Sequence, residues 1–308
     1  MHPVPEPPRG SGTVVLAVNP VAGAGRGFVA GVLAATTLRR AGLTVLEVGG
    51  DDAAGLRRAV AAALVPAPDA LVVVGGDGMV NLGLNLVAGT PIPLGVVAAG
   101  TGNDIARELG LPVRDAERAA QSVVHHLHRP VLRDAARVTT SSGETRWFMG
   151  VLAAGLDAAV NERANRAPGL GRARYLLAAL RELPTFKARD YRLHLDGEPE
   201  RRTSLLLTAA NCAAYGGGMR ICPDARPDDG LLDVLTVDPM HPSRLLALLP
   251  RLYRGTHVHH EKVAVRRVRR LRIDAPGLVA YADGERIGPL PVECEAVPGA
   301  VRVLAPDH

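Results

Sequence analysis

The feature that most constrains the fold of this chain is an alternation of short apolar runs with helix-like segments over residues 13–128. The apolar runs have the composition of strands and occupy 13–18, 43–48, 71–74 and 93–98. The segments that follow them have the apolar spacing of helices and occupy 28–41, 52–64, 79–88, 103–109 and 115–128. Strands that are apolar along their whole length, with helices between them, are typical of a parallel sheet covered on both faces. We therefore expect an α/β domain whose ligand lies at the carboxyl ends of the strands.

Three of these strands run directly into glycine-rich loops. The loops read VNPVAGAGRG at 18–27, GGDGMVN at 75–81 and AAGTGNDIAREL at 98–109. Glycine costs backbone entropy and packs nothing, but it lets a phosphate approach backbone N–H groups closely. Any one of these loops alone is more often an ordinary turn. Because the carboxyl ends of parallel strands meet at one edge of a sheet, the three loops together favour a phosphorylated nucleotide as the ligand.

Single residues in these loops point to more specific roles. Asp77 suits a hydrated Mg²⁺ ion or the hydroxyls of a nucleotide. Asp104 suits the N-cap of the helix that follows, and Asn103 its entry. The sequence contains no G-x-x-x-x-G-K-[ST], which excludes a P-loop. A dinucleotide-binding interpretation stays open, because the first loop has G-x-G-x-x-A spacing and an acidic residue ends the next strand: Gly25, Gly27, Ala30 and Glu47.

From about residue 131 the pattern changes to short strand-like runs separated by turn signals, which predicts a second, mainly antiparallel β domain. Two helix-like stretches, 170–183 and 242–254, interrupt these runs. The first combines apolar spacing with arginines, which is typical of a helix packed on a core; a lipid entrance or a membrane contact is the alternative. The Pro/Gly-rich residues 1–12 predict a flexible arm without the pattern of a signal peptide.

Composition narrows the class of protein. No apolar run reaches about 18 residues, so we expect no membrane span. The three cysteines form no C-x-x-C pair, which favours a reduced, cytoplasmic compartment. The net charge of +5 comes almost wholly from arginine and suits anionic substrates or an anionic lipid surface. Aromatic residues make up only 3%, so we expect no nucleic-acid partner. The histidine runs HHLH and HVHH lack a second pair at zinc spacing, so we expect no zinc site.

Five motifs resemble, in their order along the chain, those of the diacylglycerol kinase catalytic family, which includes bacterial lipid kinases and sphingosine and ceramide kinases. They are NPVAGAGRG, GGDGMVN, AAGTGNDIAREL, YGGGMRICPDARPDDGLLDV and DGE, and the match spans residues 14–306. The resemblance implies a Rossmann-like N-terminal α/β domain with a parallel sheet, a C-terminal antiparallel β-sandwich domain, and ATP in the cleft between them. The expected limits are a nucleotide-binding domain at 13–130, a lipid-substrate domain at 131–290, and a segment returning toward the first domain at 291–308.

The resemblance also implies roles for individual residues. In YADGERIG, Asp283 matches the general base that accepts the hydroxyl proton, and Glu285 its acidic neighbour near the metal. In DDGLLD, Asp229 and the backbone carbonyl of Leu231 match a second, structural Mg²⁺ site. The residues that would contact or lie beside ATP are Asn19, Pro20, Val21, Ala22, Gly23, Gly75, Gly76, Asp77, Gly78, Met79, Asn81, Thr101, Gly102, Asn103 and Asp104. On its residues alone, ADGE is also an ordinary hairpin turn, since Asp-Gly is a strong signal for one.

The chain departs from the family's pattern at four positions. Met79 replaces a usual threonine, Leu82 a frequent glutamate, and Ala98 a usual proline. Arg226 stands where some members carry another acidic metal ligand. The sequence therefore leaves open whether Met79 and Leu82 reduce activity and whether the second metal site is occupied.

We expect an ATP- and Mg²⁺-dependent lipid kinase, a phosphotransferase whose acceptor is an alcohol group of diacylglycerol or a related lipid. An NAD kinase, an NAD-dependent dehydrogenase and a non-enzymatic nucleotide- or lipid-binding relative remain as alternatives. The expected partners are the lipid substrate and, peripherally, an anionic membrane surface. The sequence leaves open which lipid is the acceptor, how the protein is regulated and whether it forms a homodimer.

Overall fold

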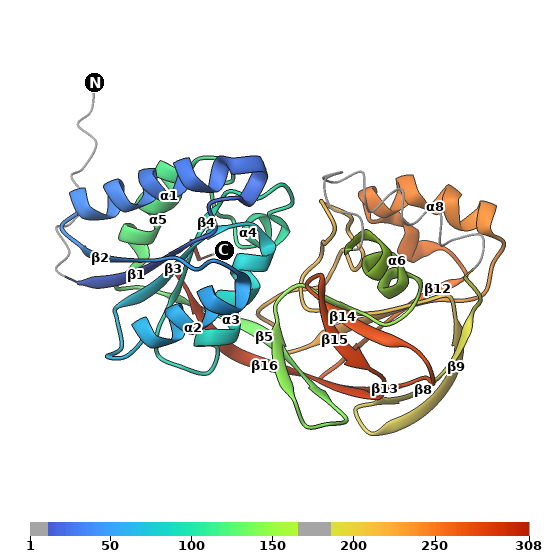
Figure 1. Ribbon diagram of the computed structural model, residues 1–308. Coiled ribbons are helices and arrows are strands. Elements are labelled where there is room, and N and C mark those ends of the chain that lie inside the picture. The colour runs from blue at the N-terminus through green and yellow to red at the C-terminus, as the bar shows by residue number, and fades with distance from the viewer. Residues whose placement is uncertain (1–11, 166–185, 308) are drawn as a thin grey trace. The chain divides into compact units, whose positions relative to one another are not determined.

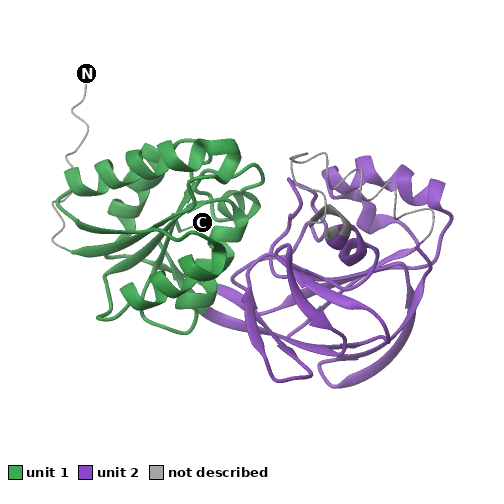
Figure 2. Ribbon diagram, viewed as in Figure 1, with its two compact units in different colours: residues 1–133, 300–308 green, residues 134–299 purple. Residues whose placement is uncertain are grey.

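The computed structural model describes residues 12–165 and 186–307. Residues 1–11 of the predicted arm and the predicted helix at 170–183 lie outside the described residues. The chain divides into two compact units: unit 1 comprises residues 1–133 and 300–308, and unit 2 comprises residues 134–299 (Figure 2). In the ranges 12–165 and 186–307, no helix combines the length and apolar character needed to span a membrane.

Unit 1 contains the predicted parallel sheet. Its strands are β1 (Thr13–Val18), β2 (Thr44–Val48), β3 (Ala70–Gly75) and β4 (Leu94–Ala98), in the order β2-β1-β3-β4. Helices α1 (Ala22–Arg40) and α5 (Ala116–His126) lie on one face of this sheet, and α2 (Ala53–Ala63) and α3 (Asp77–Val87) on the other (Figure 1). Every residue of β3 and β4 is buried, as expected for strands covered on both faces, whereas the edge strand β2 is largely exposed. The predicted α/β class is confirmed.

The first glycine loop differs from its expected form. The sequence predicted a helix from residue 28, but α1 begins at Ala22 and contains three non-helical residues, Gly23, Ala24 and Gly25, all with positive φ. The loop is therefore an irregular first turn joined to the helix. Glycine adopts positive φ without steric cost, and Ala24 is the non-glycine exception at φ 62°.

Unit 2 is built from antiparallel strands. In one sheet, β16 (Val292–Val303) pairs with β13 (Arg270–Asp274), β13 with β8 (Arg189–Leu195), and β8 with β9 (Glu198–Ser204); β5 (Val131–Thr140) pairs with β16 and with β6 (Thr145–Phe148). The other sheet has the order β12 (Val263–Val268), β11 (Leu232–Val237), β10 (Leu206–Ala210), β7 (Val151–Ala153), β14 (Val279–Ala282) and β15 (Glu285–Pro289). Both sheets supply one buried cluster, which includes Phe148, Tyr191, Leu207 and Ile273. Unit 2 is thus sandwich-like, as predicted.

In the described part of unit 2, three helical segments accompany these sheets: α6 (Leu156–Asn165), α8 (Pro242–Arg254) and the 3₁₀ turn η1 (Thr256–His259). The bounds of α8 coincide with the predicted stretch 242–254. The last strand, β16, contributes to both units: its body pairs with β13, and its end places Val303 parallel to Leu94 at the start of β4. The division between the units consequently falls within β16, after Gly299, rather than at the predicted limit of 290.

Candidate functional site

The three glycine loops meet at the carboxyl edge of the sheet in unit 1. They follow β1, β3 and β4, which are neighbours in the sheet, and backbone hydrogen bonds join them. Asn19 N–H donates to the carbonyl of Val74 over 3.0 Å, and Ala99 N–H and Gly100 N–H donate to the carbonyl of Gly75 over 2.8 and 3.2 Å. The convergence expected from the strand order is therefore a feature of the backbone itself.

Glycine is required where these loops touch. A Cβ on Gly100 would lie 2.4 Å from the Cα of Gly76, and a Cβ on Gly23 would lie 2.1 Å from the carbonyl oxygen of Ala99. Both distances are far inside van der Waals contact, and both atoms belong to backbone that has little room to move. The sequence explained these glycines as a cradle for a ligand; they also allow one loop to pack against the next.

Asp77 ties the second loop to the third. Its carboxylate accepts hydrogen bonds from Asn103 N–H over 2.9 Å and from Ile105 N–H over 3.2 Å. These donors belong to the first turn of α4 (Asp104–Glu108), so Asp77 caps a helix that is distant in sequence. Burial, followed by the nearby charge of Asp104, raises the pKa of Asp77, while the backbone hydrogen bonds oppose this rise.

The expectation that Asp104 would occupy the N-cap of this helix is wrong by one residue. Asn103 holds that position in a left-handed conformation, at φ 59°, and its side chain donates to the Gly100 carbonyl instead of capping. Asp104 begins the helix and forms a 2.5 Å ion pair with Arg107. The Asn103 Oδ1 atom is buried, and no hydrogen-bond partner for it exists among the described residues. This buried acceptor lies within the loop that the sequence assigned to nucleotide binding.

Met79 and Asn81 lie within the second loop as the sequence defined it, but the structure places them on α3, which begins at Asp77 rather than at the expected residue 79. The Met79 side chain is buried, and a Cβ on Gly75 would lie 2.5 Å from the Met79 Cγ atom. The methionine that replaces the family's threonine therefore packs beneath the loop. Thr101 and Gly102 follow Gly100 in the third loop, and Thr101 is exposed.

Asp283 lies in unit 2, in the turn between β14 and β15. Asp283 and Gly284 both have positive φ, at 50° and 83°, so ADGE is the hairpin turn that its residues predicted. The Asp283 carboxylate also accepts three backbone hydrogen bonds, from Met149, Gly150 and Val151, over 3.0, 2.9 and 3.1 Å. The turn thus holds this carboxylate in one orientation. Glu285 follows it, exposed, as the first residue of β15.

Sequence reasoning missed the segment that receives Asp283. A Cβ on Gly150 would lie 2.6 Å from the Asp283 Oδ1 atom, so the carboxylate can approach only because residue 150 is glycine. The sequence signal was the lone glycine between two apolar runs in FMGVLA.

Asp229 and Leu231 lie together in the loop before β11. Asp229 is exposed, and its Oδ1 atom accepts a hydrogen bond from Leu231 N–H over 3.0 Å. The same loop is held by Asp134, another residue that the sequence did not single out. The buried Asp134 carboxylate accepts from Gly230 N–H over 2.6 Å and from Gly299 N–H over 2.8 Å.

The carboxylate and carbonyl oxygens at these sites can be compared with the ligands that Mg²⁺ prefers. Over residues 12–165 and 186–307, no three His, Cys, Asp or Glu side chains group to hold a metal ion. Mg²⁺ in kinase sites takes one or two carboxylates, with water and substrate phosphates completing its shell. Asp77, beside the charge of Asp104, fits that requirement. At the second site, the Asp229 carboxylate and the Leu231 carbonyl offer two hard oxygen ligands, so this assignment stays a prediction.

Comparisons with known proteins cover both units. Residues 13–133 match the diacylglycerol kinase catalytic domain, and residues 150–305 match the YegS C-terminal NAD kinase beta sandwich-like domain. A diacylglycerol kinase of Mycobacterium tuberculosis is 41% identical over 299 residues, which cover 96% of each chain. A diacylglycerol kinase of Bacillus subtilis is 25% identical over 248 residues, with 77% of this chain and 78% of that protein covered.

Solved structures show the same fold. A putative diacylglycerol kinase from Bacillus anthracis superposes with a TM-score of 0.75 at 21% identity, over 96% of this chain and 97% of that one. An NAD kinase from Archaeoglobus fulgidus in complex with ATP gives a TM-score of 0.51 at 16% identity, over 96% and 93%. At these identities the likeness concerns the fold alone. The matches to both domains and to the mycobacterial enzyme show that the chain belongs to the diacylglycerol kinase family, a family of lipid kinases.

Proposed function

We propose that this protein transfers the γ-phosphoryl group of ATP to a hydroxyl of diacylglycerol or a related lipid, with Mg²⁺ as cofactor. The observation that carries the proposal is the junction of the three glycine loops at the carboxyl edge of one parallel sheet. Exposed backbone N–H groups at helix starts bind phosphate oxygens. Membership of a kinase family supports ATP as the nucleotide that these loops bind.

In this proposal the loops bind and orient the nucleotide. Asn19 to Gly23, Gly75 to Asn81 and the stretch from Thr101 to Asp104 supply the contacts. Asp77 acts as a positioning residue as well, because its carboxylate fixes the N–H groups of Asn103 and Ile105. Those two N–H groups are occupied by Asp77, but the third loop that they belong to is held in place by them. A loop held in place costs no reorganisation when charge develops on the phosphates, which is where positioning accelerates phosphoryl transfer.

Asp283 is the proposed general base. Its carboxylate would accept the proton of the lipid hydroxyl while that oxygen attacks the γ-phosphorus and the bond to the ADP oxygen breaks. The hydrogen bonds from residues 149–151 hold the carboxylate in a fixed orientation for that step. Mg²⁺ bound by the ATP phosphates would neutralise their charge, and Asp77 would supply a carboxylate ligand. The family resemblance gives Glu285 the role of acidic neighbour of the base. Because the proposed roles fall on residues of both units, neither unit alone should be active.

An NAD kinase is the second candidate, because the C-terminal match carries an NAD kinase-like description and an NAD kinase shares the fold. The 41% identity with a diacylglycerol kinase over nearly the whole chain favours the lipid as acceptor. A dehydrogenase is less well supported, because Glu47, the residue that would bind the ribose of NAD, forms a 2.7 Å ion pair with Arg39. A lipid acceptor also implies contact with a membrane surface, and the net charge of +5 suits an anionic one.

An acceptor competition separates these candidates. The protein is incubated with γ-labelled ATP, Mg²⁺, NAD and detergent-dispersed lipids that include diacylglycerol, sphingosine and ceramide, and the labelled products are then resolved. We expect label in one organic-phase lipid, none in NADP, and no transfer when EDTA removes Mg²⁺. Label in NADP alone would replace the proposal with an NAD kinase. ATP binding without any labelled product would indicate a non-enzymatic relative.

A further inference from the structure

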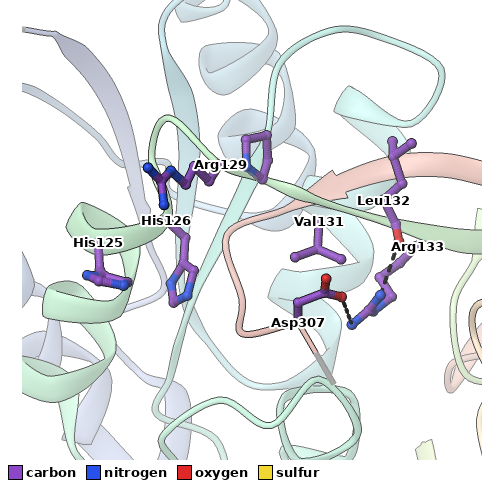
Figure 3. Close-up of a pocket in the computed structure, with 8 residues that line it drawn as sticks. His125, His126, Arg129, Val131, Leu132, Arg133 and Asp307 are labelled. Atoms are coloured by element: carbon purple, nitrogen blue, oxygen red, sulfur yellow. Dashed lines mark hydrogen bonds and ion pairs between the residues drawn. The ribbon is translucent and has the colours of Figure 1, made fainter.

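A cavity of about 670 Å³ opens in unit 1 beside the end of α5 (Figure 3). Its lining comes from the last turn of α5, from the connection that follows it, from the first residues of β5 and from the C-terminal tail. All of these residues lie within 1–133 and 300–308, so the cavity belongs to unit 1.

The cavity lies away from the glycine loops. Before α5 begins, Val113 forms a bridge with Ala98 at the carboxyl end of β4. Further along α5, Val123 packs at the start of β4, where a Cβ on Gly95 would lie 2.9 Å from its Cγ2 atom. The helix therefore runs back toward the amino end of the sheet, and its last residues reach the cavity there. No step of the proposed kinase reaction uses this edge.

Arg133 is the central feature of the cavity. Its side chain is 8% exposed, yet among the described residues its guanidinium donates only one hydrogen bond, from Nη1 to the Leu132 carbonyl over 3.2 Å. The carboxylate that faces it, that of Asp307, is 4.0 Å from Nη2 and belongs to a side chain that is 86% exposed (Figure 3). A guanidinium carries five N–H donors, and a buried charge is costly without a close partner. Within the described part of the chain, Arg133 is thus a buried cation whose one ion pair is a 4.0 Å contact with an exposed carboxylate.

The rest of the cavity adds positive charge. Within the residues described, the Arg129 guanidinium has neither an ion pair nor a hydrogen bond. His126 uses its Nδ1 atom on the Ser122 carbonyl, 2.8 Å away, so Nε2 is its remaining polar atom. Among the described residues that line the cavity, Asp307 is the one that is acidic. The start of β5 also contributes apolar surface, since the Leu132 side chain is 55% exposed.

We propose that this cavity binds a phosphomonoester, with Arg129 and Arg133 on the phosphate oxygens and the organic part against Val131 and Leu132. The planar guanidinium fork matches phosphate oxygens, and two arginines balance a dianion. The volume lies within the range of small-molecule sites, about 300–1,000 Å³. An incoming phosphate would replace the loose contact of Asp307 with Arg133. The site does not depend on the proposed kinase reaction.

Titration calorimetry at constant ionic strength tests the site on the full chain. The probes are inorganic phosphate, glycerol 3-phosphate, and phosphatidylcholine vesicles with and without phosphatidate. Arg129→Gln should weaken binding by about tenfold or more, because a charged hydrogen bond is lost. Asp307→Asn should tighten binding, because it removes the competing carboxylate. Arg118→Gln is the control: Arg118 lies on α5, is exposed and pairs with Asp115, so binding should not change.

The probes distinguish the source of the ligand. Binding of glycerol 3-phosphate in preference to inorganic phosphate supports a soluble ester, and binding only to phosphatidate vesicles supports a lipid headgroup. The proposal is overturned if no probe binds, if Arg129→Gln and Asp307→Asn both bind as the wild type does, or if Arg118→Gln loses as much as Arg129→Gln. Arg133→Met, checked for folding by circular dichroism, repeats the test at the buried position.

Discussion

At the scale of the residue, three aspartate side chains bind backbone in the same way: Asp77, Asp134 and Asp283. Each carboxylate accepts two or three backbone N–H groups from a segment distant in sequence. A carboxylate has about four lone-pair positions, so such a residue can join two loops firmly. These side chains therefore hold backbone segments in place. For Asp77 and Asp283 this structural role is separate from any contact with substrate.

The first prediction concerns the hairpin aspartate of unit 2. Asp283→Asn should lower the free energy of unfolding by about 1–3 kcal/mol, because the amide nitrogen replaces an oxygen that faces N–H donors. Asp196→Asn is the matched control. Asp196 also precedes glycine with positive φ, and it accepts two N–H groups, from Arg269 and Arg270. Both bonds to Asp196 end on its Oδ1 atom, which an asparagine keeps, whereas the donors to Asp283 use both of its oxygens. Urea denaturation should therefore show the loss in Asp283→Asn and little change in Asp196→Asn; an unchanged midpoint for Asp283→Asn would contradict the hydrogen-bonded arrangement.

The second prediction concerns pH and Asp157, at the start of α6. Burial raises the pKa of Asp157 to about 7, and its Oδ2 atom has no hydrogen-bond partner among the described residues. The unfolded value is about 3.9, so the folded state binds the proton more tightly. The stability that this group contributes is complete below pH ~4 and is lost as the pH rises to about 7.

Asp157→Asn should therefore be more stable than the wild type at pH 8, by about 1–3 kcal/mol, and the difference should shrink toward pH 4. Urea denaturation at several pH values measures this difference. Asp51→Asn, at an exposed position, should change stability by less than about 0.5 kcal/mol throughout. A difference for Asp157→Asn that does not vary with pH would contradict the prediction.

At the scale of the element, the sequence predicted the strands, most helices and the three loops, because apolar period and glycine runs are local signals. It did not predict that Asp77 caps α4, since that contact joins residues 26 and 28 positions apart. Local capping rules instead pointed to Asp104, which begins the helix. Asp134 was missed for a related reason: its partners, Gly230 and Gly299, are brought to it only by the assembled sandwich.

The third prediction tests the packing of the loops. Gly100→Ala should cost about 1–3 kcal/mol of stability and weaken ATP binding, because its Cβ would meet the backbone of Gly76. Gly49→Ala is the control, since nothing lies within 4 Å of the added atom. Thermal unfolding and equilibrium ATP binding measure the two effects. Equal stability and equal ATP affinity in the two variants would show that the close approach of the loops contributes to neither property.

At the scale of the whole molecule, the last strand, β16, decides which residues belong to each unit. The sequence predicted an α/β and a β domain, but it could not locate the division within β16, because a single run of residues pairs with strands of both units. Beyond that division, Leu304 and Ala305 are fully buried, and Leu304 N–H donates to the Leu94 carbonyl over 2.9 Å. Residues 300–308 are thus part of the core of unit 1.

The fourth prediction follows from that placement. A chain that ends at Gly299 should lose at least about 3 kcal/mol of stability in unit 1, because several fully buried apolar side chains are removed. A chain that ends at Pro306 should remain within about 0.5 kcal/mol of the wild type. Limited proteolysis and urea denaturation report the loss. Equal stability of the two truncated chains would contradict the role given to residues 300–305.

The central claim, phosphoryl transfer to a lipid hydroxyl with Asp283 as the base, is tested most directly by the rate of label transfer from γ-labelled ATP to diacylglycerol. The rate is measured for the wild type, Asp283→Asn and Asp196→Asn at a temperature where all three are folded. We predict labelled phosphatidate from the wild type, a rate about 10² to 10⁴ lower for Asp283→Asn, and an unchanged rate for Asp196→Asn. No labelled lipid from the wild type, or an Asp283→Asn rate within a few-fold of it, would contradict the claim.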